Sequence, residues 1–564
     1  MKATKTRGSN NLWARIAPTR RRRELVAAMG VATSIALLTM AAPAPGQTSG
    51  GTQPRVLRVG TYRGMRGDFS TIQDAVDNAQ PGDWVLIAPG DYHEQGDHRG
   101  PGPATDAQGG VMITTPGIHI RGLDRNNVIV DGTKPGSRPC DKSAAAQDPG
   151  PSDADGNPVG RNGIEVFEVD GVSIENLTVC NFLSAGDSGN EIWWNGGDGT
   201  GTINIGPYHG AYLTATSTYY GGPDQPAGEY GIFVSNSSGP GLLEHTYASN
   251  MHDSSYYIGA CADCDVVVDD AHAQGSALGY SGTNSGGHLI LQNSEWDNNK
   301  TGISMNSQNN DDAPSPQDGA CPGDETGPTG SASCTLIRNN YIHNNGNPNV
   351  PEQGSAALGP VGTGIVLSGG RNDTVIGNRI EDEGSWGVLV VPFIDSGPPP
   401  PIAHCDGGTL ESDGVTCYYD SWGHEVTGNT FKNVGFYGNA SNGDLADLSS
   451  VHDPGNCWHD NVDQSGSVSS APDGLQSTHA TCGVPNSGDD LSSDLAAQVI
   501  CATEIFGPCP DQPGMHYPRS TQVYLVPLLP QRTMPDPCAD VPANPWCKKT
   551  PPPLLPNRSR VRAS

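Results

Sequence analysis

A spacing of about 23 residues recurs through the middle of the sequence and limits the folds that the chain can adopt. The segments Ala248-Ser249-Asn250, Ala273-Gln274-Gly275 and Trp296-Asp297-Asn298 follow one another at steps of 25 and 23 residues. Two longer steps, of 69 residues from Val179 and of 46 residues to Ile342, lie close to whole multiples of this unit. A regular repeat of this length predicts stacked coils, whereas a propeller blade needs about 40 to 45 residues.

Each repeat contains short β-type runs and lacks a helical period. Val266-Val267-Val268 and Leu289-Ile290-Leu291 are followed by turns rich in Asn, and then by a second run that opens with Gly, as in Gly302-Ile303 and Gly364-Ile365. Two or three short strands per repeat, with abundant Asn and Gly, predict an all-β parallel solenoid.

The segment before the repeats adds a short helix and a strand. Between Phe69 and Ala79 the apolar residues recur on one helical face, Pro81-Gly82 ends that pattern, and a strand follows at Trp84-Val85-Leu86-Ile87. With Pro89-Gly90-Asp91-Tyr92 and Glu94, this block resembles the opening of the pectin-lyase-like superfamily. The resemblance implies a right-handed parallel β-helix whose first coil is capped by the helix, because an end coil exposes apolar interior and strand edges.

The resemblance does not carry a reaction with it. The chain has a polygalacturonase-like Asp269-Asp270 pair but lacks the other motifs of that family. The Arg-x-Pro-x-x-Arg of pectate lyases, the Asp-Phe-Ile-Phe-Gly of pectinesterases and the Asp-Pro-His of alginate epimerases are also absent from the sequence. Function therefore has to be argued from the site itself.

The N-terminus has the pattern of an export signal. Residues 1–45 hold eight basic residues and one acidic residue, a local charge of +7, followed by an apolar run from Leu25 to Met40 and by Ala41-Ala42-Pro43-Ala44. This pattern predicts a signal peptide and a secreted or cell-surface protein. Two alternatives are a twin-arginine signal at Arg20 to Arg23 and a segment retained as a membrane anchor. After signal cleavage no stable membrane partner is expected.

Three further regions follow the signal. We predict the β-helix domain over residues 55–450, a disulfide-rich extension covering the last coil over residues 451–548, and a disordered Pro-rich basic tail over residues 549–564. The chain has 14 cysteines, an even number that fits an exported, oxidised protein. Cysteines that are close in sequence predict six bridges: Cys261 with Cys264, Cys321 with Cys334, Cys405 with Cys417, Cys457 with Cys482, Cys501 with Cys509, and Cys538 with Cys547. A redox or zinc motif is the alternative for Cys261 and Cys264.

The charge restricts the partners. The formal net charge is −30, so the chain beyond the basic leader carries a charge near −37. Such a surface repels nucleic acid, and it disfavours polyuronates unless Ca²⁺ bridges the carboxylates. We therefore expect an extracellular polysaccharide as partner, with calcium as the candidate cofactor and Asp263 and Asp265 as candidate metal ligands. The sequence does not specify an oligomeric state.

Alignment of the repeats stacks polar residues into two columns on the outer face. Strand alternation places Glu244, Asp269, Gln292 and Arg338 in one column, with His245, Asp270, Asn293 and Asn339 beside it. Neighbouring carboxylates raise one another's pKa, and a histidine and an arginine complete the groups that a glycosidase or a lyase uses. The predicted catalytic residues are Glu244, His245, Asp269, Asp270 and Arg338. The alternative is that these side chains form hydrogen-bonded ladders that only stabilise the coil.

Aromatic and histidine side chains near these repeats suggest a sugar-binding surface. The predicted substrate-binding residues are Trp193, Trp194, Tyr219, Tyr220, His252, Tyr256, Tyr257 and His288. Exposed rings stack on sugar faces, although rings that fill a bulged coil would give the same composition. Two functions remain: a secreted polysaccharide hydrolase or lyase, and a non-catalytic glycan-binding or adhesive rod. An accessory factor for copper or carbohydrate maturation is a further alternative.

Overall fold

The structure is a computed structural model that describes residues 53–547 except 96–97, 100–107, 153–154, 186–188, 198–204, 310–320, 322–324, 397–404, 451, 453, 486–493, 506, 508 and 510–513. The described residues from Arg55 onward form one compact unit. The predicted signal peptide and the predicted basic tail lie outside the described residues. None of the helices in the described residues has the length and apolar character needed to cross a membrane.

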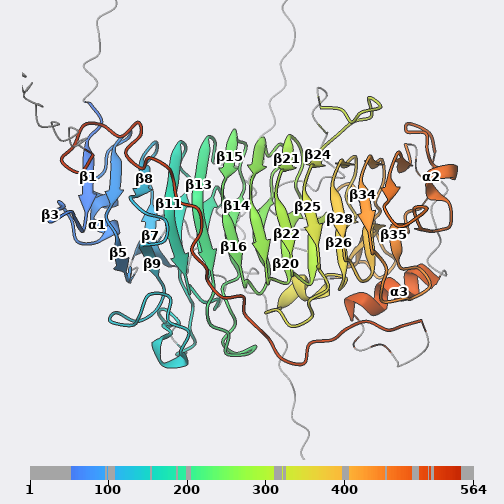
Figure 1. Cartoon of the computed structure of the whole chain (residues 1–564), viewed down its shortest axis with the longest axis horizontal. Helices are drawn as coiled ribbons and strands as arrows, with labels where there is room; N and C mark the ends of the chain where they lie inside the picture. Colours follow the sequence, from blue (N-terminus) through green and yellow to red (C-terminus); the bar gives the residue numbers. More distant parts are fainter. Residues whose placement is uncertain are drawn as a thin grey trace, which may run out of the picture. The chain divides into compact units, whose positions relative to one another are not determined.

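The described chain winds into stacked coils of short parallel strands (Figure 1). A typical coil consists of β18 (Val266–Asp269), β19 (His272–Gln274) and β20 (Leu278–Thr283). Each strand pairs in parallel with its equivalent in the next coil, so that Val266 pairs with Leu289 and Leu278 pairs with Thr301. The fold is therefore the predicted all-β right-handed parallel β-helix.

Two sheets run the length of the stack. The large sheet holds the first and second strands of each coil: β1 (Val56–Val59), β4 (Trp84–Ile87), β5 (Gly90–Tyr92), β8 (His119–Gly122), β9 (Val128–Asp131), β11 (Val172–Cys180), β13 (Tyr208–Thr216), β15 (Gly241–Glu244), β16 (Tyr247–Ser249), β18, β19, β21 (Leu289–Gln292), β22 (Glu295–Asp297), β24 (Thr335–Arg338), β25 (Tyr341–His343), β27 (Thr374–Ile376), β28 (Arg379–Glu381), β33 (Glu425–Thr427), β34 (Thr430–Lys432), β36 (Cys457–His459) and β37 (Val462–Asp463).

The small sheet holds the third strands: β6 (His98–Arg99), β7 (Gln108–Ile113), β10 (Asn162–Phe167), β12 (Ile192–Asn195), β14 (Tyr230–Ser235), β17 (Ser254–Gly259), β20, β23 (Thr301–Asn306), β26 (Thr363–Ser368), β29 (Trp386–Val391), β35 (Gly443–Asp447) and β38 (Ser470–Ala471). Outside these sheets lie a hairpin, β2 (Thr61–Tyr62) with β3 (Met65–Arg66), and a three-stranded group, β30 (Phe393–Asp395), β31 (Thr409–Leu410) and β32 (Cys417–Tyr419). Two 3₁₀ turns are η1 (Ala144–Ala146) and η2 (Gly354–Leu358).

The two longer steps in the sequence contain fewer coils than their length suggests. Trp296 pairs directly with Ile342, so the step of 46 residues is one coil that carries an insertion. Val179 pairs with Ala215, which pairs with Ala248, so the step of 69 residues spans two coils and not three. Loops between strands vary in length, whereas only the strand residues stack, and sequence distance therefore overestimates the number of coils.

Asparagine residues occupy many of the bends between the strands of a coil. The residue after the first strand of several coils has a positive φ, as in Asn293 (51°) and Asn339 (55°), a conformation that Asn tolerates better than most residues. A second, buried row of Asn bridges successive coils, because the Asn340 side-chain amide donates to Asn378 at 3.0 Å and that of Asn378 donates to Asn429 at 3.0 Å. The Asn-rich turns of the sequence thus become ladders inside the fold.

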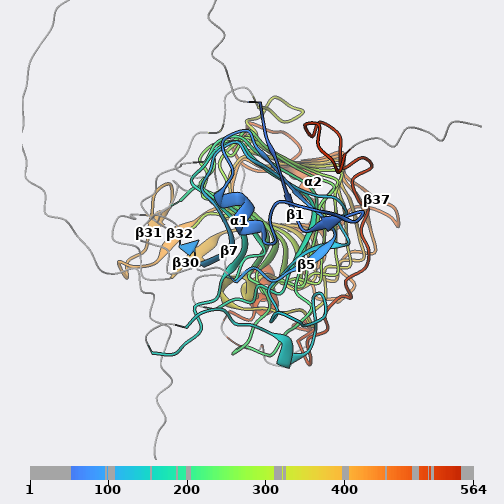
Figure 2. The ribbon, with the colours of Figure 1, turned by 90° about the vertical axis from the view of Figure 1, so that its left-hand side faces the viewer.

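A short helix lies at the first coil. Helix α1 (Ile72–Asp77) begins at Thr71, whose hydroxyl accepts from the Asp74 backbone N–H at 3.2 Å. It buries Ile72 and Val76 in the main core and contacts β1, β4 and β7 (Figure 2). The helix is shorter than the predicted 69–79 segment, and its role as an end cap stays a prediction.

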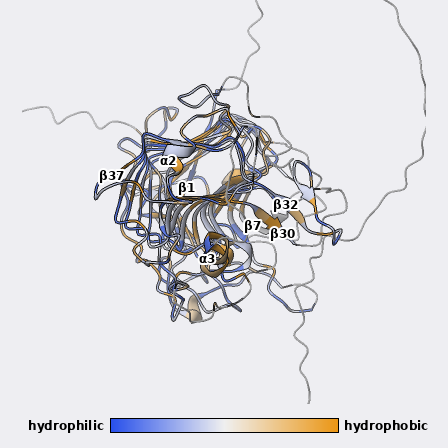
Figure 3. Ribbon diagram, turned by 90° about the vertical axis from the view of Figure 1, so that its right-hand side faces the viewer, coloured by the Kyte–Doolittle hydropathy of each residue, from blue (hydrophilic) through white to orange (hydrophobic). Residues whose placement is uncertain are grey.

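The C-terminal region begins later than predicted and covers more than the last coil. Parallel pairing continues to β36, β37 and β38, so the coils extend beyond residue 450. Helix α2 (Leu475–Thr478) contacts β36, and α3 (Asp494–Thr503) packs Leu495 and Ala502 into an apolar cluster with residues of β26, β29 and β35 (Figure 3).

Residues 514–547, here called the C-terminal strap, then run back along the large sheet toward the first coil (Figure 1). The Asn250 side chain donates to the Val526 carbonyl at 2.9 Å, the Asn126 side chain donates to that of Gln531 at 2.8 Å, and the Trp546 indole donates to that of Met65 at 3.2 Å. The extension was predicted to cover the last coil, and the strap also contacts coils as early as the first. The strap uses amide side chains that project from the bends of the coil.

All six predicted disulfides are present. A seventh joins Cys140 to Cys180. The spacing of 40 residues between this last pair hides their proximity, which arises only when two coils stack.

Candidate functional site

The predicted catalytic column forms as expected. Glu244 pairs with Asp269, Asp269 with Gln292, and Gln292 with Arg338, all on the outer face of the large sheet. The Arg338 guanidinium donates to the Gln292 side-chain carbonyl at 2.6 and 2.9 Å, and so it does not face a carboxylate of the column. The Asn293 amide donates to Asp269 at 2.7 Å.

The neighbouring coils add charged residues that sequence reasoning missed. His209 lies between Glu175 (3.1 Å) and Glu244 (3.2 Å), and Arg121 donates to the other oxygen of Glu175. Burial alone would lower the pKa of His209, but hydrogen bonds with the two carboxylates outweigh it and raise the pKa. These residues belong to coils whose length departs from the repeat, which is why the spacing did not reveal them.

The charged side chains of this network pair with one another. His245 Nδ1 lies 2.5 Å from Asp270, and His209 and His245 both face Glu244. Burial would raise the pKa of Glu175, but hydrogen bonds from His209 and Arg121 outweigh it and lower the pKa. Each carboxylate named here has a histidine, arginine or amide partner, which is the arrangement of the ladder alternative. The catalytic role of these residues stays a prediction.

Several predicted binding residues lie inside the coil. Trp194 and Tyr256 are fully buried in the main core, and His252 is only 5% exposed, so the prediction that these rings contact ligand is wrong. Alternation along the strands explains the error, because Trp193 and Tyr257 face outward and their neighbours face inward.

The remaining predicted residues are dispersed. Tyr219 and Tyr220 are half-buried in the loop after β13, where the Tyr219 hydroxyl donates to Gln225 at 2.7 Å. His288 lies 2.8 Å from the exposed Asp263. Asp265 is half-buried, and neither aspartate belongs to a group of three or more metal-ligating side chains among the described residues.

Trp193 and Tyr257 are part of an aromatic platform on the outer face of the small sheet. Strand register places Trp193, Phe233 and Tyr257 in one column. The Trp193 and Phe233 rings are stacked with centroids 4.7 Å apart, and the Phe233 and Tyr257 centroids are 4.8 Å apart. Tyr230 lies beside both, 4.5 Å from Phe233. Phe233 and Tyr230 were not predicted, because single aromatic residues in a strand give no signal of their own.

The platform leads into a cavity of about 300 Å³. The next residues of the column, Ser281 and Ser304, lie on its floor with Asn306 and Gln308. Its walls come from η2, from β30 and from the C-terminal end of α3, which contribute mainly apolar side chains. An apolar pocket with a few hydrogen-bonding groups on its floor is the usual form of a ligand site.

One carboxyl group reaches this cavity. Asp253 is 8% exposed and accepts a hydrogen bond from the Ser254 hydroxyl at 2.5 Å. Burial raises its pKa to about 6, and the hydrogen bonds with Ser254 and Tyr230 offset this only in part. Among the described residues that line the cavity, Asp253 is the only Asp, Glu, Lys, Arg or His.

Comparison with known proteins agrees with the architecture. The family model for a right handed beta helix region matches residues 325–450. The chain is a right-handed parallel β-helix protein. No curated protein matches it.

Three solved structures illustrate the range of β-helix proteins to which the chain is similar. The A-module of mannuronan C-5 epimerase AlgE4 from Azotobacter vinelandii is 14% identical, covers 71% of this chain and 88% of its own, and has a TM-score of 0.35. An alginate lyase from Paenibacillus sp. is 13% identical, with coverage of 67% and 95% and a TM-score of 0.33. A lacto-N-biosidase from Eubacterium ramulus is 12% identical, with coverage of 72% and 64% and a TM-score of 0.37. At these identities and TM-scores, the similarity says nothing about the function of this chain.

Proposed function

We propose that the protein binds an uncharged extracellular polysaccharide along the outer face of the small sheet, over the aromatic platform and into the cavity beyond it. The observation that carries the proposal is the lining of the cavity, whose described residues include no cation and a single buried carboxyl group. A polyuronate would need cations or bridging metal ions there. The net charge of −30 would also repel it.

The surface suits the chemistry of neutral sugars. Sugar rings present C–H faces that pack on aromatic rings, and the platform offers Trp193, Phe233 and Tyr257 at successive positions of one column. Hydroxyl and amide groups of Ser281, Ser304 and Asn306 supply partners for sugar hydroxyls on the cavity floor. Seven disulfides fit an oxidising location such as the outside of the cell. A neutral ligand makes a calcium requirement unnecessary, and calcium stays a proposal for polyuronate binding alone.

Substitution of the platform tests this function. We expect Trp193→Ala and Tyr257→Ala to weaken binding of a neutral polysaccharide by 5- to 30-fold, equivalent to about 1 to 2 kcal/mol. Affinity electrophoresis against neutral and uronic-acid polymers, with Ca²⁺ and with chelator, gives the measurement. Tyr341→Ala is the matched control, because Tyr341 is a partly exposed ring on the large sheet. Equal losses in all three variants, or binding only to uronates with Ca²⁺, would contradict the proposal.

Hydrolysis of the bound chain is a second candidate function, and Asp253 is the observation that favours it. A carboxyl group with a pKa of about 6 is partly protonated near neutral pH and can act as a general acid. Glycosidases ordinarily use a second carboxylate, and none of the other described lining residues supplies one. Mass spectrometry of products decides this: fragments that have gained water, lost on Asp253→Asn, would establish a hydrolase. Unsaturated fragments would indicate a lyase, and intact polymer would leave a binding protein.

A further inference from the structure

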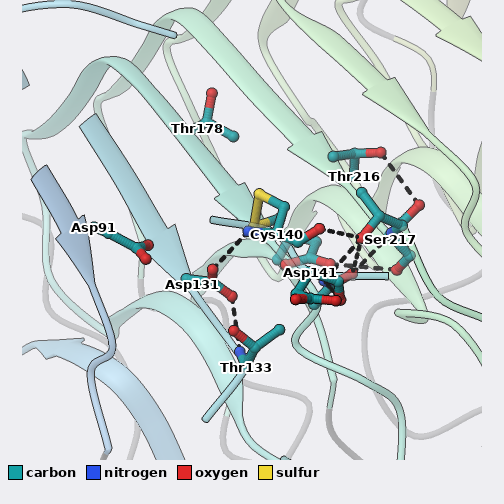
Figure 4. The surroundings of a disulfide bond; sticks show 12 residues. Asp91, Asp131, Thr133, Cys140, Asp141, Thr178, Thr216 and Ser217 are labelled. Carbon is teal, nitrogen blue, oxygen red and sulfur yellow. Dashed lines mark hydrogen bonds between the residues drawn. A yellow bond between two sulfur atoms is a disulfide. The ribbon is translucent and has the colours of Figure 1, made fainter. Parts of the chain in front are cut away.

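A compact group of metal-ligating side chains lies in the early coils, away from the cavity and the platform. Asp91 lies in β5, His93 follows it, and Asp131 ends β9 in the next coil. Ligand atoms of these three side chains all lie within 4.8 Å of one another. Asp91 points toward Asp131 in Figure 4.

The histidine is oriented as a metal ligand would be. His93 Nδ1 lies 2.8 Å from the Thr133 carbonyl, which can only accept, so Nδ1 carries the proton. In the neutral ring, Nε2 then presents a lone pair to Asp91 Oδ2 at 3.1 Å. In that form two acceptors face each other and need either a shared proton or a cation between them. Metal-bound histidines typically donate their other N–H to a carbonyl or carboxylate in this way.

Oxygen atoms in the group lack partners. Asp91 Oδ1 and Thr133 Oγ1 are buried without a hydrogen bond, and Thr133 is fully buried. Most buried polar atoms in proteins are satisfied, so Asp91 Oδ1 has a coordination position that a bound cation would fill.

The second carboxylate is fixed by the backbone. Asp131 accepts from the Thr133 N–H at 2.8 Å and from the Cys140 N–H at 2.6 Å, one on each oxygen (Figure 4). The Cys140–Cys180 disulfide anchors the segment that supplies the second donor. Each carboxylate oxygen keeps a further lone pair, so Asp131 can hold an ion without losing these bonds.

We propose that His93 Nε2 and the carboxylates of Asp91 and Asp131 bind a divalent ion of the zinc class. An imidazole with two carboxylates matches Zn²⁺, whereas Ca²⁺ takes six to eight oxygen ligands. Zinc bonds of about 2.0 to 2.1 Å separate tetrahedral ligands by about 3.3 Å. The 3.1 Å between His93 Nε2 and Asp91 Oδ2 is close to this value. Water would complete the coordination.

A second group provides the sharpest alternative. His272, Glu295 and Asp297 also place ligand atoms within 4.8 Å of one another on the large sheet. There His272 Nε2 lies 2.7 Å from Asp297, all three side chains are partly exposed, and no unpartnered buried oxygen of that group is present among the described residues. It lacks the fixed N–H partner and the unsatisfied oxygens that support the Asp91 group.

Titration calorimetry of the chelator-treated, disulfide-intact protein with ZnCl₂ and with CaCl₂ tests the proposal. We expect one Zn²⁺ site that Asp91→Asn and His93→Gln each weaken at least 10-fold, consistent with the loss of one ligand, and no comparable Ca²⁺ site. His288→Ala is the matched control, since His288 forms the same kind of His–Asp pair, at 2.8 Å from Asp263. Unchanged Zn²⁺ affinity in both ligand variants, or affinity lost only in His272→Ala, would overturn the assignment.

A thermal measurement guards against misfolded variants. Asp91→Asn is isosteric and keeps a hydrogen bond to His93, so it should fold. Zn²⁺ should raise the Tm of the wild-type protein and leave that of Asp91→Asn unchanged, because a ligand stabilises only the state that binds it. An equal Zn²⁺-dependent rise in both proteins would place the ion elsewhere. The glycan-binding proposal is independent of this result.

Discussion

At the scale of the residue, burial and not function accounts for most of the carboxyl groups whose pKa is raised in this fold. Burial raises the pKa of Glu383 to about 8 and that of Asp373 to about 7, and neither residue lines the cavity beside the platform. Asp253 shares their shift but lines the cavity beside the platform. A raised pKa therefore singles out Asp253 only in combination with its position.

The buried acids predict an unusual pH dependence of stability. Glu383 has a folded-state pKa of about 8, above its unfolded value, so the folded state binds the proton more tightly. Its contribution is fully present below the unfolded pKa of about 4.3 and is lost as pH rises toward 8. We expect the free energy of unfolding to fall between pH 5 and pH 8, by an amount on the order of 1 to 3 kcal/mol for this residue.

Urea denaturation at several pH values measures this slope, and Glu383→Gln should flatten it because Gln does not titrate. The test lies in the slope, whatever the absolute stability of the variant. A variant with the same pH dependence as the wild-type protein would show that Glu383 does not titrate in this range.

At the scale of the element, local signals in the sequence were sufficient to predict the register of the strands. The alternation around Val266 and Val268 predicted which side chains point outward, and the Glu244, Asp269, Gln292 and Arg338 column followed from it. The aromatic composition alone does not predict the interior position of Trp194 and Tyr256, because rings on the two faces of a strand give the same composition. The alternation along β12 and β17 places both rings inside, because their neighbours Trp193 and Tyr257 face outward.

The buried Asn ladder should be the most sensitive part of the coil. Asn378 donates to Ile337 O (2.9 Å) and Asn429, and accepts from Asn340 N–H (2.9 Å). Asn378→Ala would leave these buried groups unpaired, at a cost of about 3 kcal/mol or more.

Asn433→Ala is the control, because Asn433 is exposed and bonds only to Asp382 among the described contacts. That variant should cost about 1 kcal/mol for its positive φ. Equal losses in urea denaturation would contradict a special role for the ladder.

At the scale of the whole molecule, the sequence predicted the architecture but not the long-range contacts. The repeat period and the Asn-rich turns are local features, and they indicated a β-helix. The path of the C-terminal strap depends on contacts such as that between Trp546 and Met65, which are 481 residues apart. The His209 network and the cavity likewise combine residues from several coils and loops. No spacing rule connects such residues before the coils are stacked.

The strap should stabilise the first coil locally. Trp546 is 2% exposed, packs edge-on against Tyr62 at 5.9 Å and donates to the Met65 carbonyl. Trp546→Ala should remove about 3 to 5 kcal/mol of packing. The strap is tied to the coils by individual hydrogen bonds along its length, so we expect local detachment and not global unfolding.

Hydrogen exchange should therefore accelerate at residues 531–547 and in β2 and β3, while β18 and β21 stay protected. Tyr524→Ala, at a side chain that is 60% exposed, should leave the exchange pattern unchanged. Uniform acceleration through all coils would instead mean that the strap holds the whole stack together.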